Sequence, residues 1–203
     1  MKKKLYINIL LFLLFSLHLT AQRGRYENVI KLDLVEPFYS TLGASFEKFI
    51  PDTDFSIQFN GSLTTRKITV WESLAANVRG YGAELQGRYY FSMKHHTLPS
   101  GVYNGIYAKY APLKITMHIP EGDVNILDGN SKIIGFFAGY QHGFGNRFFV
   151  DATFGGGYHI ADYRGKFSQK GRVIPSIISS GIIPKFDVKM AVAFWNSQLV
   201  ISE

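Results

Sequence analysis

Ten charged side chains stand at alternate positions of segments in which every second residue is apolar. Five are acids and five are bases, and they are Asp33, Glu47, Glu84, Asp151 and Asp187 with Lys31, Arg88, Lys109, Lys185 and Lys189. Because residues i and i+2 of a β-strand lie on one face, we expect all ten on the polar face of a sheet. Unpaired buried charge is costly, so equal numbers of acids and bases on one face favour ion pairing. The set therefore predicts a structural network of paired charges.

The chain offers few combinations suited to catalysis or metal binding. It has no Cys, which excludes a disulfide scaffold, a Cys nucleophile and a Cys-based zinc site. His95 and His96 are adjacent but have no nearby carboxylate to complete a metal site. His118 and His142 flank a predicted connection near Ser131, an arrangement that would suit hydrolysis of a lipid or peptide if the three met at one rim. We predict no catalytic residue, no metal and no cofactor, and keep this arrangement as the enzymatic alternative.

A group of bases precedes an apolar stretch near the end of the chain. The bases are Arg164, Lys166, Lys170 and Arg172, and the apolar stretch covers residues 173–184. At the outer surface of a membrane such bases can pair with lipid phosphates, whereas in water they form an ordinary solvated charge group; both readings stay open. The apolar stretch has three interpretations: a lid over a barrel mouth, an extension of the flanking strands, or a surface that binds a partner.

The elements that must position these side chains are strands. Apolar residues recur with a period of two in eight segments, at residues 29–35, 42–49, 54–63, 81–91, 102–110, 133–142, 148–163 and 184–195. The fifth segment extends to residue 118, and its apolar positions change from even to odd numbers at residues 111–112, which predicts a bulge or bend. The sequence therefore predicts an all-β fold of eight strands.

The connections between the predicted strands alternate between short and long. Residues 64–80, 119–132 and 164–183 form the long connections, after the third, fifth and seventh strands. Short turns at one end, long loops at the other and an even number of strands are typical of outer-membrane barrels. Eight strands leave an interior that side chains just fill. We therefore predict an eight-stranded antiparallel up-and-down transmembrane β-barrel with extracellular long loops and a lumen plugged by the paired charges.

Aromatic residues lie on the apolar face near the ends of the predicted strands. They are Tyr81, Tyr89, Phe91, Tyr110, Tyr140, Phe148, Tyr158 and Phe194. In a membrane barrel the apolar face contacts lipid and aromatic residues mark the two interfaces. The alternative is a soluble lipocalin-like barrel, which turns its apolar face inward around a lipid.

The first 21 residues have the pattern of a secretory signal peptide. Lys2, Lys3 and Lys4 precede an apolar core that is too short to span a bilayer, and Ala21 supplies a small residue at the cleavage point. We predict a signal peptide at residues 1–21 and one outer-membrane β-barrel domain at residues 22–203. Removing three lysines reduces the formal net charge from +7 to +4, too little for a nucleic-acid-binding protein. An aromatic content of 15% excludes a disordered chain.

Three segments carry a resemblance to known barrels. Residues 28–34, residues 45–48 and the final strand at residues 186–194 resemble the small eight-stranded outer-membrane barrels of Gram-negative bacteria. OmpA-like and OmpX-like barrels are the architectural reference, but the sequence resembles an uncharacterised barrel family with the same first two strands more closely than it resembles either of them. The resemblance implies the fold and a bacterial outer-membrane location, and no reaction. The final strand is also similar to the signal that barrel-assembly machinery recognises, although residues 196–203 continue beyond it.

These observations favour a non-enzymatic outer-membrane barrel with a structural or partner-binding role through its extracellular loops. The expected partners are outer-membrane lipids including lipopolysaccharide, the barrel-assembly machinery during biogenesis, and an extracellular or periplasmic protein of unknown identity. A lipid- or peptide-modifying barrel enzyme and a soluble lipocalin-like lipid-binding barrel remain the two alternatives.

Overall fold

The computed structural model describes residues 26–51, 53–71, 74–91, 100–118, 124–144, 147–166 and 173–195. This part of the chain forms eight strands: β1 (Tyr26–Asp33), β2 (Thr41–Phe49), β3 (Phe55–Trp71), β4 (Leu74–Tyr90), β5 (Gly101–His118), β6 (Val124–Phe144), β7 (Phe148–Lys166) and β8 (Val173–Trp195). A short 3-10 helix, η1 (Glu36–Tyr39), joins β1 to β2. None of the described residues belongs to a helix long and apolar enough to cross a membrane. The predicted signal peptide lies outside the described residues.

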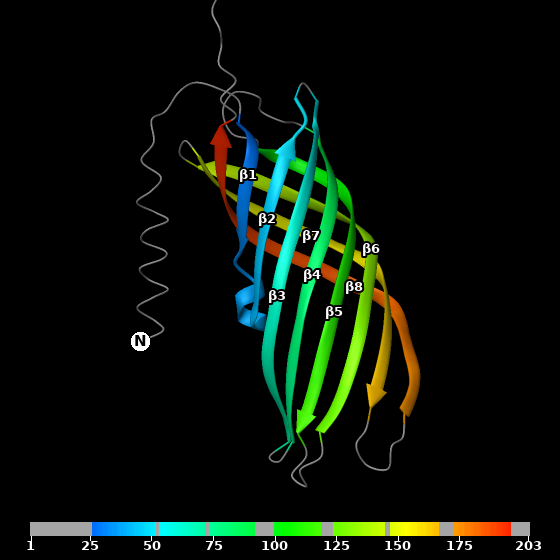
Figure 1. Ribbon diagram of the computed structural model, residues 1–203. Helices are drawn as coiled ribbons and strands as arrows, with labels where there is room; N and C mark the ends of the chain where they lie inside the picture. The colour runs from blue at the N-terminus through cyan, green and yellow to red at the C-terminus, as the bar shows by residue number, and fades with distance from the viewer. Residues whose placement is uncertain are drawn as a thin grey trace, which may run out of the picture.

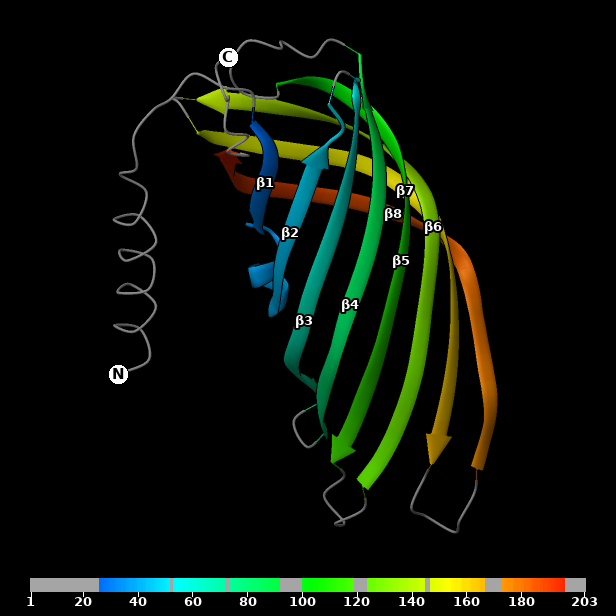
Figure 2. The same ribbon diagram turned by 45° about the horizontal axis from the view of Figure 1, so that its top comes forward.

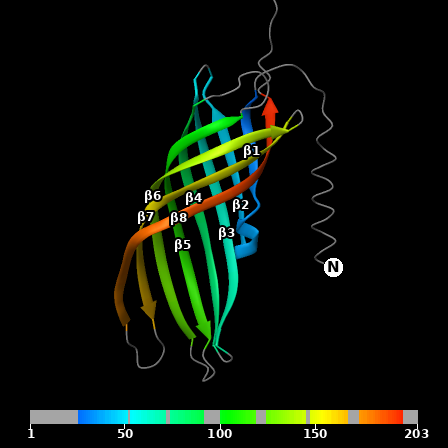
Figure 3. The same ribbon diagram turned by 180° about the vertical axis from the view of Figure 1, so that it is seen from behind.

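The eight strands close into a barrel. Each strand pairs antiparallel with the next along the chain (Figure 1), and β8 pairs back with β1 (Figure 3). The closing register places Asp33 opposite Lys189 and Ile30 opposite Val192. The prediction of an all-β, eight-stranded, antiparallel up-and-down barrel is confirmed.

The prediction of three long loops is wrong, because most of those residues are strand. Residues 64–71 and 74–80 continue β3 and β4, residues 124–132 belong to β6, and residues 173–183 belong to β8. Only residues 72–73, 119–123 and 167–172 separate these strands. The apolar stretch after the basic group therefore extends β8, which is one of its three predicted interpretations.

The strand extensions continue past the closed part of the barrel. β1 and β2 have 8 and 9 residues, whereas β8 has 23. β2 pairs with β3 only as far as Thr41 opposite Thr64, and β1 pairs with β8 only as far as Asp33 opposite Lys189. Figure 2 shows β3 to β8 running on beyond η1 as a curved sheet. In the described residues β3 and β8 do not pair with each other there, so this sheet, which we call the extension, is open on one side.

Of the bulge or bend predicted at residues 111–112, the bulge is absent, although the pairing of β5 with β4 is interrupted at these two residues. β5 pairs with β6 in one uninterrupted register through residues 111–112, and it pairs with β4 in the same register before and after them. What changes is the face that carries the apolar residues. Ile106 and Tyr110 point outward and are exposed, whereas Leu113 and Ile115 point inward and are half-buried. The shift from even to odd apolar positions therefore marks the start of the extension.

The two parts of the barrel have opposite sidedness. In the closed part large apolar side chains point outward, and Phe136 is 75% exposed, whereas Lys31 and Glu47 point inward and are fully buried. In the extension Arg79 points outward and is exposed, while Ala161 points inward and is buried. Outward apolar residues are expected where a barrel contacts lipid, and outward charges where it contacts water.

Aromatic residues occupy both faces of the closed part. Six of the eight aromatic residues predicted on the apolar face are exposed, namely Tyr81, Tyr89, Phe91, Tyr110, Tyr140 and Tyr158. Phe148 is half-buried, and the side chain of Phe194 lies outside the described part. A second set fills the lumen at one end and consists of Phe49, Tyr90, Tyr103, Tyr107, Phe137 and Phe149. This inner set packs beside the charged side chains described next.

Candidate functional site

Four of the ten predicted lumen charges form one fully buried group, which we call the central cluster: Lys31, Glu47, Arg88 and Asp151. Lys31 Nζ lies 2.6 Å from Glu47 Oε2 and also contacts the Asp151 carboxylate. Arg88 Nη1 lies 2.8 Å from Asp151 Oδ2 and 3.7 Å from Glu47 Oε1. The four residues come from β1, β2, β4 and β7, so each charge contacts two opposite charges across the lumen.

Tyrosine hydroxyls add hydrogen bonds to the two central carboxylates. The Tyr90 hydroxyl donates to Glu47 Oε1 at 3.0 Å, and the Tyr103 hydroxyl donates to Asp151. Both tyrosines are fully buried. The sequence analysis missed them, although Tyr90 shares the parity of Arg88 on β4 and therefore belongs to the inward face. A buried carboxylate is stabilised by such donors, so the tyrosines are part of the charged network.

Arg88 has the largest number of partners in the central cluster. Its Nε and Nη2 donate to Gln86 Oε1 at 2.9 Å and 2.7 Å. Its Cζ lies 4.6 Å from the ring centre of Tyr103 and 5.6 Å from that of Phe137. A guanidinium stacked on aromatic rings and hydrogen-bonded to fixed acceptors has little freedom to move. Arg88 therefore joins the charged and aromatic parts of the lumen.

A second group of charges, the outer cluster, lies nearer the extension. Lys185 Nζ is 2.8 Å from Glu84 Oε1 and 2.9 Å from Asp187 Oδ2. Lys189 Nζ donates to Asn60 Oδ1 at 3.2 Å. Lys109 is half-buried and lines the same polar cavity as these residues. The structure thus separates the predicted set into two levels of the lumen.

Asp33 has a different contact from the predicted ion pair. Its Oδ1 accepts hydrogen bonds from the backbone N–H groups of Val35 and Glu36, both at 2.8 Å. This side chain therefore fixes the turn from β1 into η1. Glu36, which the sequence analysis did not single out, is half-buried in the β1–β2 connection and lines the cavity of the outer cluster. Burial, and next the negative charge of Asp33, raise the pKa of Glu36.

The predicted basic group is only partly described. Arg164 is exposed, and its Nη2 lies 3.4 Å from Asp162 Oδ2. Lys166 ends β7 and its side chain is outside the described part, as are Lys170 and Arg172 altogether. The register reveals two further bases beside Arg164: Arg79 lies opposite Lys114, Lys114 opposite Asp128, and Asp128 opposite Arg164. Arg79 was not among the predicted site residues, because residues 64–80 were predicted to be a loop.

The predicted histidine and serine arrangement does not form. Ser131 and His142 both lie on β6, and eleven residues of strand separate them by about 36 Å. His118 pairs with Val124 at the opposite end of β6 from His142. The His142 Nδ1 instead lies 3.3 Å from the Tyr140 hydroxyl. Within the described residues, no group of three or more His, Asp or Glu side chains is arranged to hold a metal ion.

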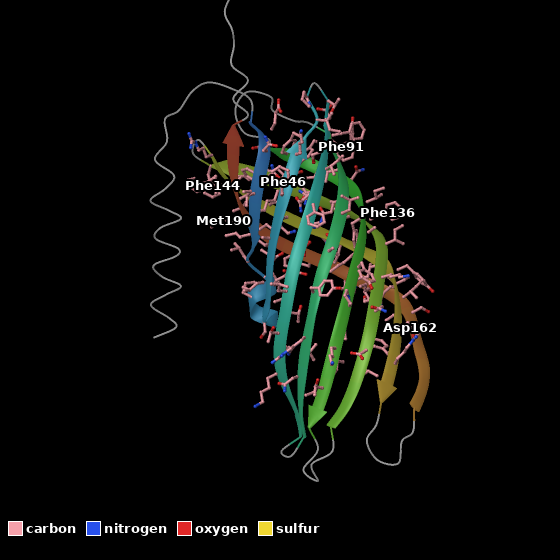
Figure 4. The ribbon with its side chains drawn as sticks, viewed as in Figure 1. Phe46, Phe91, Phe136, Phe144, Asp162 and Met190 are labelled. Atoms are coloured by element: carbon pink, nitrogen blue, oxygen red, sulfur yellow. The ribbon has the colours of Figure 1, made fainter. Side chains whose placement is uncertain are left out.

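On the outer surface, as in the lumen, different kinds of side chain lie at different levels along the barrel axis. In Figure 4, Phe91 and Phe144 lie toward the end of the barrel that contains Trp195, Phe136 lies between the ends, and Asp162 lies toward the extension. Exposed apolar residues therefore lie on the closed part, whereas the exposed bases Arg79, Lys114 and Arg164 lie toward the extension, as half-buried Asp162 does.

The fold and this site define a closed eight-stranded antiparallel barrel with ion-paired polar residues inside and apolar residues outside. Residues 8–175 match the model of the family described as "Protein of unknown function (DUF3575)", and the chain belongs to this family. No curated protein and no solved structure matches the chain.

Proposed function

We propose that this chain is a non-enzymatic barrel of the bacterial outer membrane. Its lumen is closed by paired charges, and its extension serves a structural or partner-binding role outside the cell. The main support is the sidedness of the closed part, where apolar side chains point outward and the central cluster is buried inside. A soluble lipid carrier would have the reverse arrangement around its ligand.

The height of the outward apolar band fits a membrane. Along β4 and the residue after it, the band runs from Tyr81 to Phe91, an interval of ten residue steps, or about 33 Å of extended chain. A strand tilt of about 40° reduces this to about 25 Å, the height of the apolar band in outer-membrane barrels. Exposed tyrosine and phenylalanine at the two ends match the aromatic girdles of such barrels.

Cell fractionation tests the location. The full chain, expressed in a Gram-negative host, should be recovered with outer membranes, and its gel mobility should change when the sample is boiled, because a folded barrel resists detergent at room temperature. Recovery in the soluble periplasm with no change on boiling would refute the membrane proposal and favour the soluble carrier.

Planar-bilayer recording tests the closed lumen. We expect the purified barrel to show no large, steady conductance, because the side chains of the central cluster fill the interior. A stable pore of porin size would show that the charges line a channel. A preparation that passes the mobility test and still conducts would contradict only the plug.

A further inference from the structure

A groove crosses the outer surface where the closed part meets the extension. It has a volume of about 560 Å³ and is lined by residues of β3 to β7. Its apolar side includes Leu63, Tyr81 and Pro112, and its charged side has three bases and two acids: Arg79, Lys114, Arg164, Asp128 and Asp162. The groove therefore lies at the boundary of the proposed membrane band, where lipid headgroups begin.

Arg79 and Lys114 face each other in this groove, whereas its two acids lie on the far side of Lys114: Asp128 is opposite Lys114 on β6, and Asp162 is on β7. Arg79 lies directly opposite Lys114, and like charges in this position are destabilising. The direct and diagonal neighbours of Arg79 on β3 and β5, all described residues, include no acid. A phosphate can accept hydrogen bonds from both bases and remove their repulsion. The pair thus suits a phosphate ligand.

An apolar hollow lies beneath the groove on β4 to β8. It has a volume of about 700 Å³, and its lining includes Leu85, Ile134 and Phe136. The hollow exists because Gly87 and Gly156 occupy outward positions among large apolar side chains. A Cβ on Gly87 would meet only Ile106 Cγ1, at 3.9 Å, so packing within the barrel does not require glycine there.

The groove and the hollow fit the two parts of one lipid. Gly80 in the groove and Gly87 in the hollow are on the same strand, about 23 Å apart. A phosphate between Arg79 and Lys114 would place an acyl chain over Tyr81 and into the hollow. A free phosphate would occupy only the groove and leave the hollow empty. Binding of a protein partner would not depend on a phosphate group.

We propose that this outer surface binds one phosphate-bearing, acylated lipid of the outer leaflet, with its phosphate on Arg79 and Lys114 and an acyl chain in the hollow beside Gly87. This inference rests on the proposed membrane location. It assigns the phosphate contact to two bases outside the predicted group, of which Arg164, the member whose side chain is described, also lines the groove.

Native mass spectrometry of the purified full chain tests the lipid site, with lipid A as the probe. We expect one lipid A per barrel. Arg79→Gln combined with Lys114→Gln, and Gly87→Leu alone, should each weaken the affinity about tenfold, because one removes charge-assisted hydrogen bonds and the other fills the hollow. Dephosphorylated lipid A should bind the parent chain as weakly as the double variant binds lipid A.

Two matched controls isolate the site. Lys48→Gln removes an exposed outward charge at the opposite rim, and Gly61→Leu adds a side chain where a Cβ would meet nothing within 4 Å. Neither should change lipid A affinity. Equal weakening by the controls, tight binding of inorganic phosphate alone, or formation of dimers in place of lipid binding would each overturn the proposal. The boiling-dependent mobility of every variant reports separately on the membrane barrel.

Discussion

Replacing Arg88 tests whether the central cluster stabilises the barrel through specific ion pairs. Arg88→Met keeps much of the side-chain volume but leaves Asp151 and Glu47 with Lys31 as their one basic partner in the cluster. Arg88 is fully buried and its Nη1 lies 2.8 Å from Asp151 Oδ2. Removing one partner of a buried ion pair costs about 3–5 kcal/mol, because the remaining charge stays out of water. We therefore expect a loss of about 3–5 kcal/mol in the free energy of unfolding.

A double-mutant cycle separates this pairing from lost packing. Asp151→Asn removes the opposite charge, and it should also destabilise the barrel strongly. The variant with both substitutions has no broken pair between these positions, so its loss should be smaller than the sum of the single losses by about 1–3 kcal/mol. Urea unfolding of the barrel in lipid vesicles, followed by tryptophan fluorescence, gives the four free energies.

An additive result would refute the reasoning. If the two single losses sum to the double loss within about 0.5 kcal/mol, the charges do not interact and water must solvate them in the lumen. The exposed pair of Arg164 and Asp162, with Nη2 and Oδ2 3.4 Å apart, is the matched control. Its cycle should give less than about 1 kcal/mol.

Three further changes test other parts of the structure. Because folding raises the pKa of Glu36, the free energy of unfolding of the parent should fall as pH rises above the unfolded pKa of 4.5. Glu36→Gln should therefore be more stable than the parent near neutral pH, and this gain should vanish in acid. Urea unfolding at several pH values measures both effects. Phe136→Lys places a charge in the outward apolar band and should cost about 2–4 kcal/mol in vesicles; no loss would argue against lipid contact. A Cβ on Gly139 would lie 2.3 Å from the Tyr103 ring, so Gly139→Ala should lower the free energy of unfolding by about 1–3 kcal/mol, whereas Gly61→Ala should not.

The period of two predicted the strands of the closed part because each residue there lies either on the apolar outer face or on the polar inner face. The same rule placed the ten charges inward, but it did not identify which acid meets which base. Register alone would pair Lys189 with Asp151, since the two lie directly opposite. Instead Lys31, two strands from Asp151, reaches it across the narrow lumen, while Lys189 donates to Asn60. Long side chains in an eight-stranded barrel can thus bypass their nearest neighbours, and no local pattern records this.

The extension was missed for a related reason. Residues 64–71 carry Thr, Arg and Lys in place of strict alternation, and that part of β3 satisfies its backbone by pairing with β4 without an apolar outer face. Most residues of the long intervals that suggested loops are therefore strand ends. The predicted difference between the two ends of the barrel remains, because the extensions of β3 to β8 all lie at one end. The orientation proposed from loop length thus rests on the extension, whose outward charges require water where the closed part presents apolar residues.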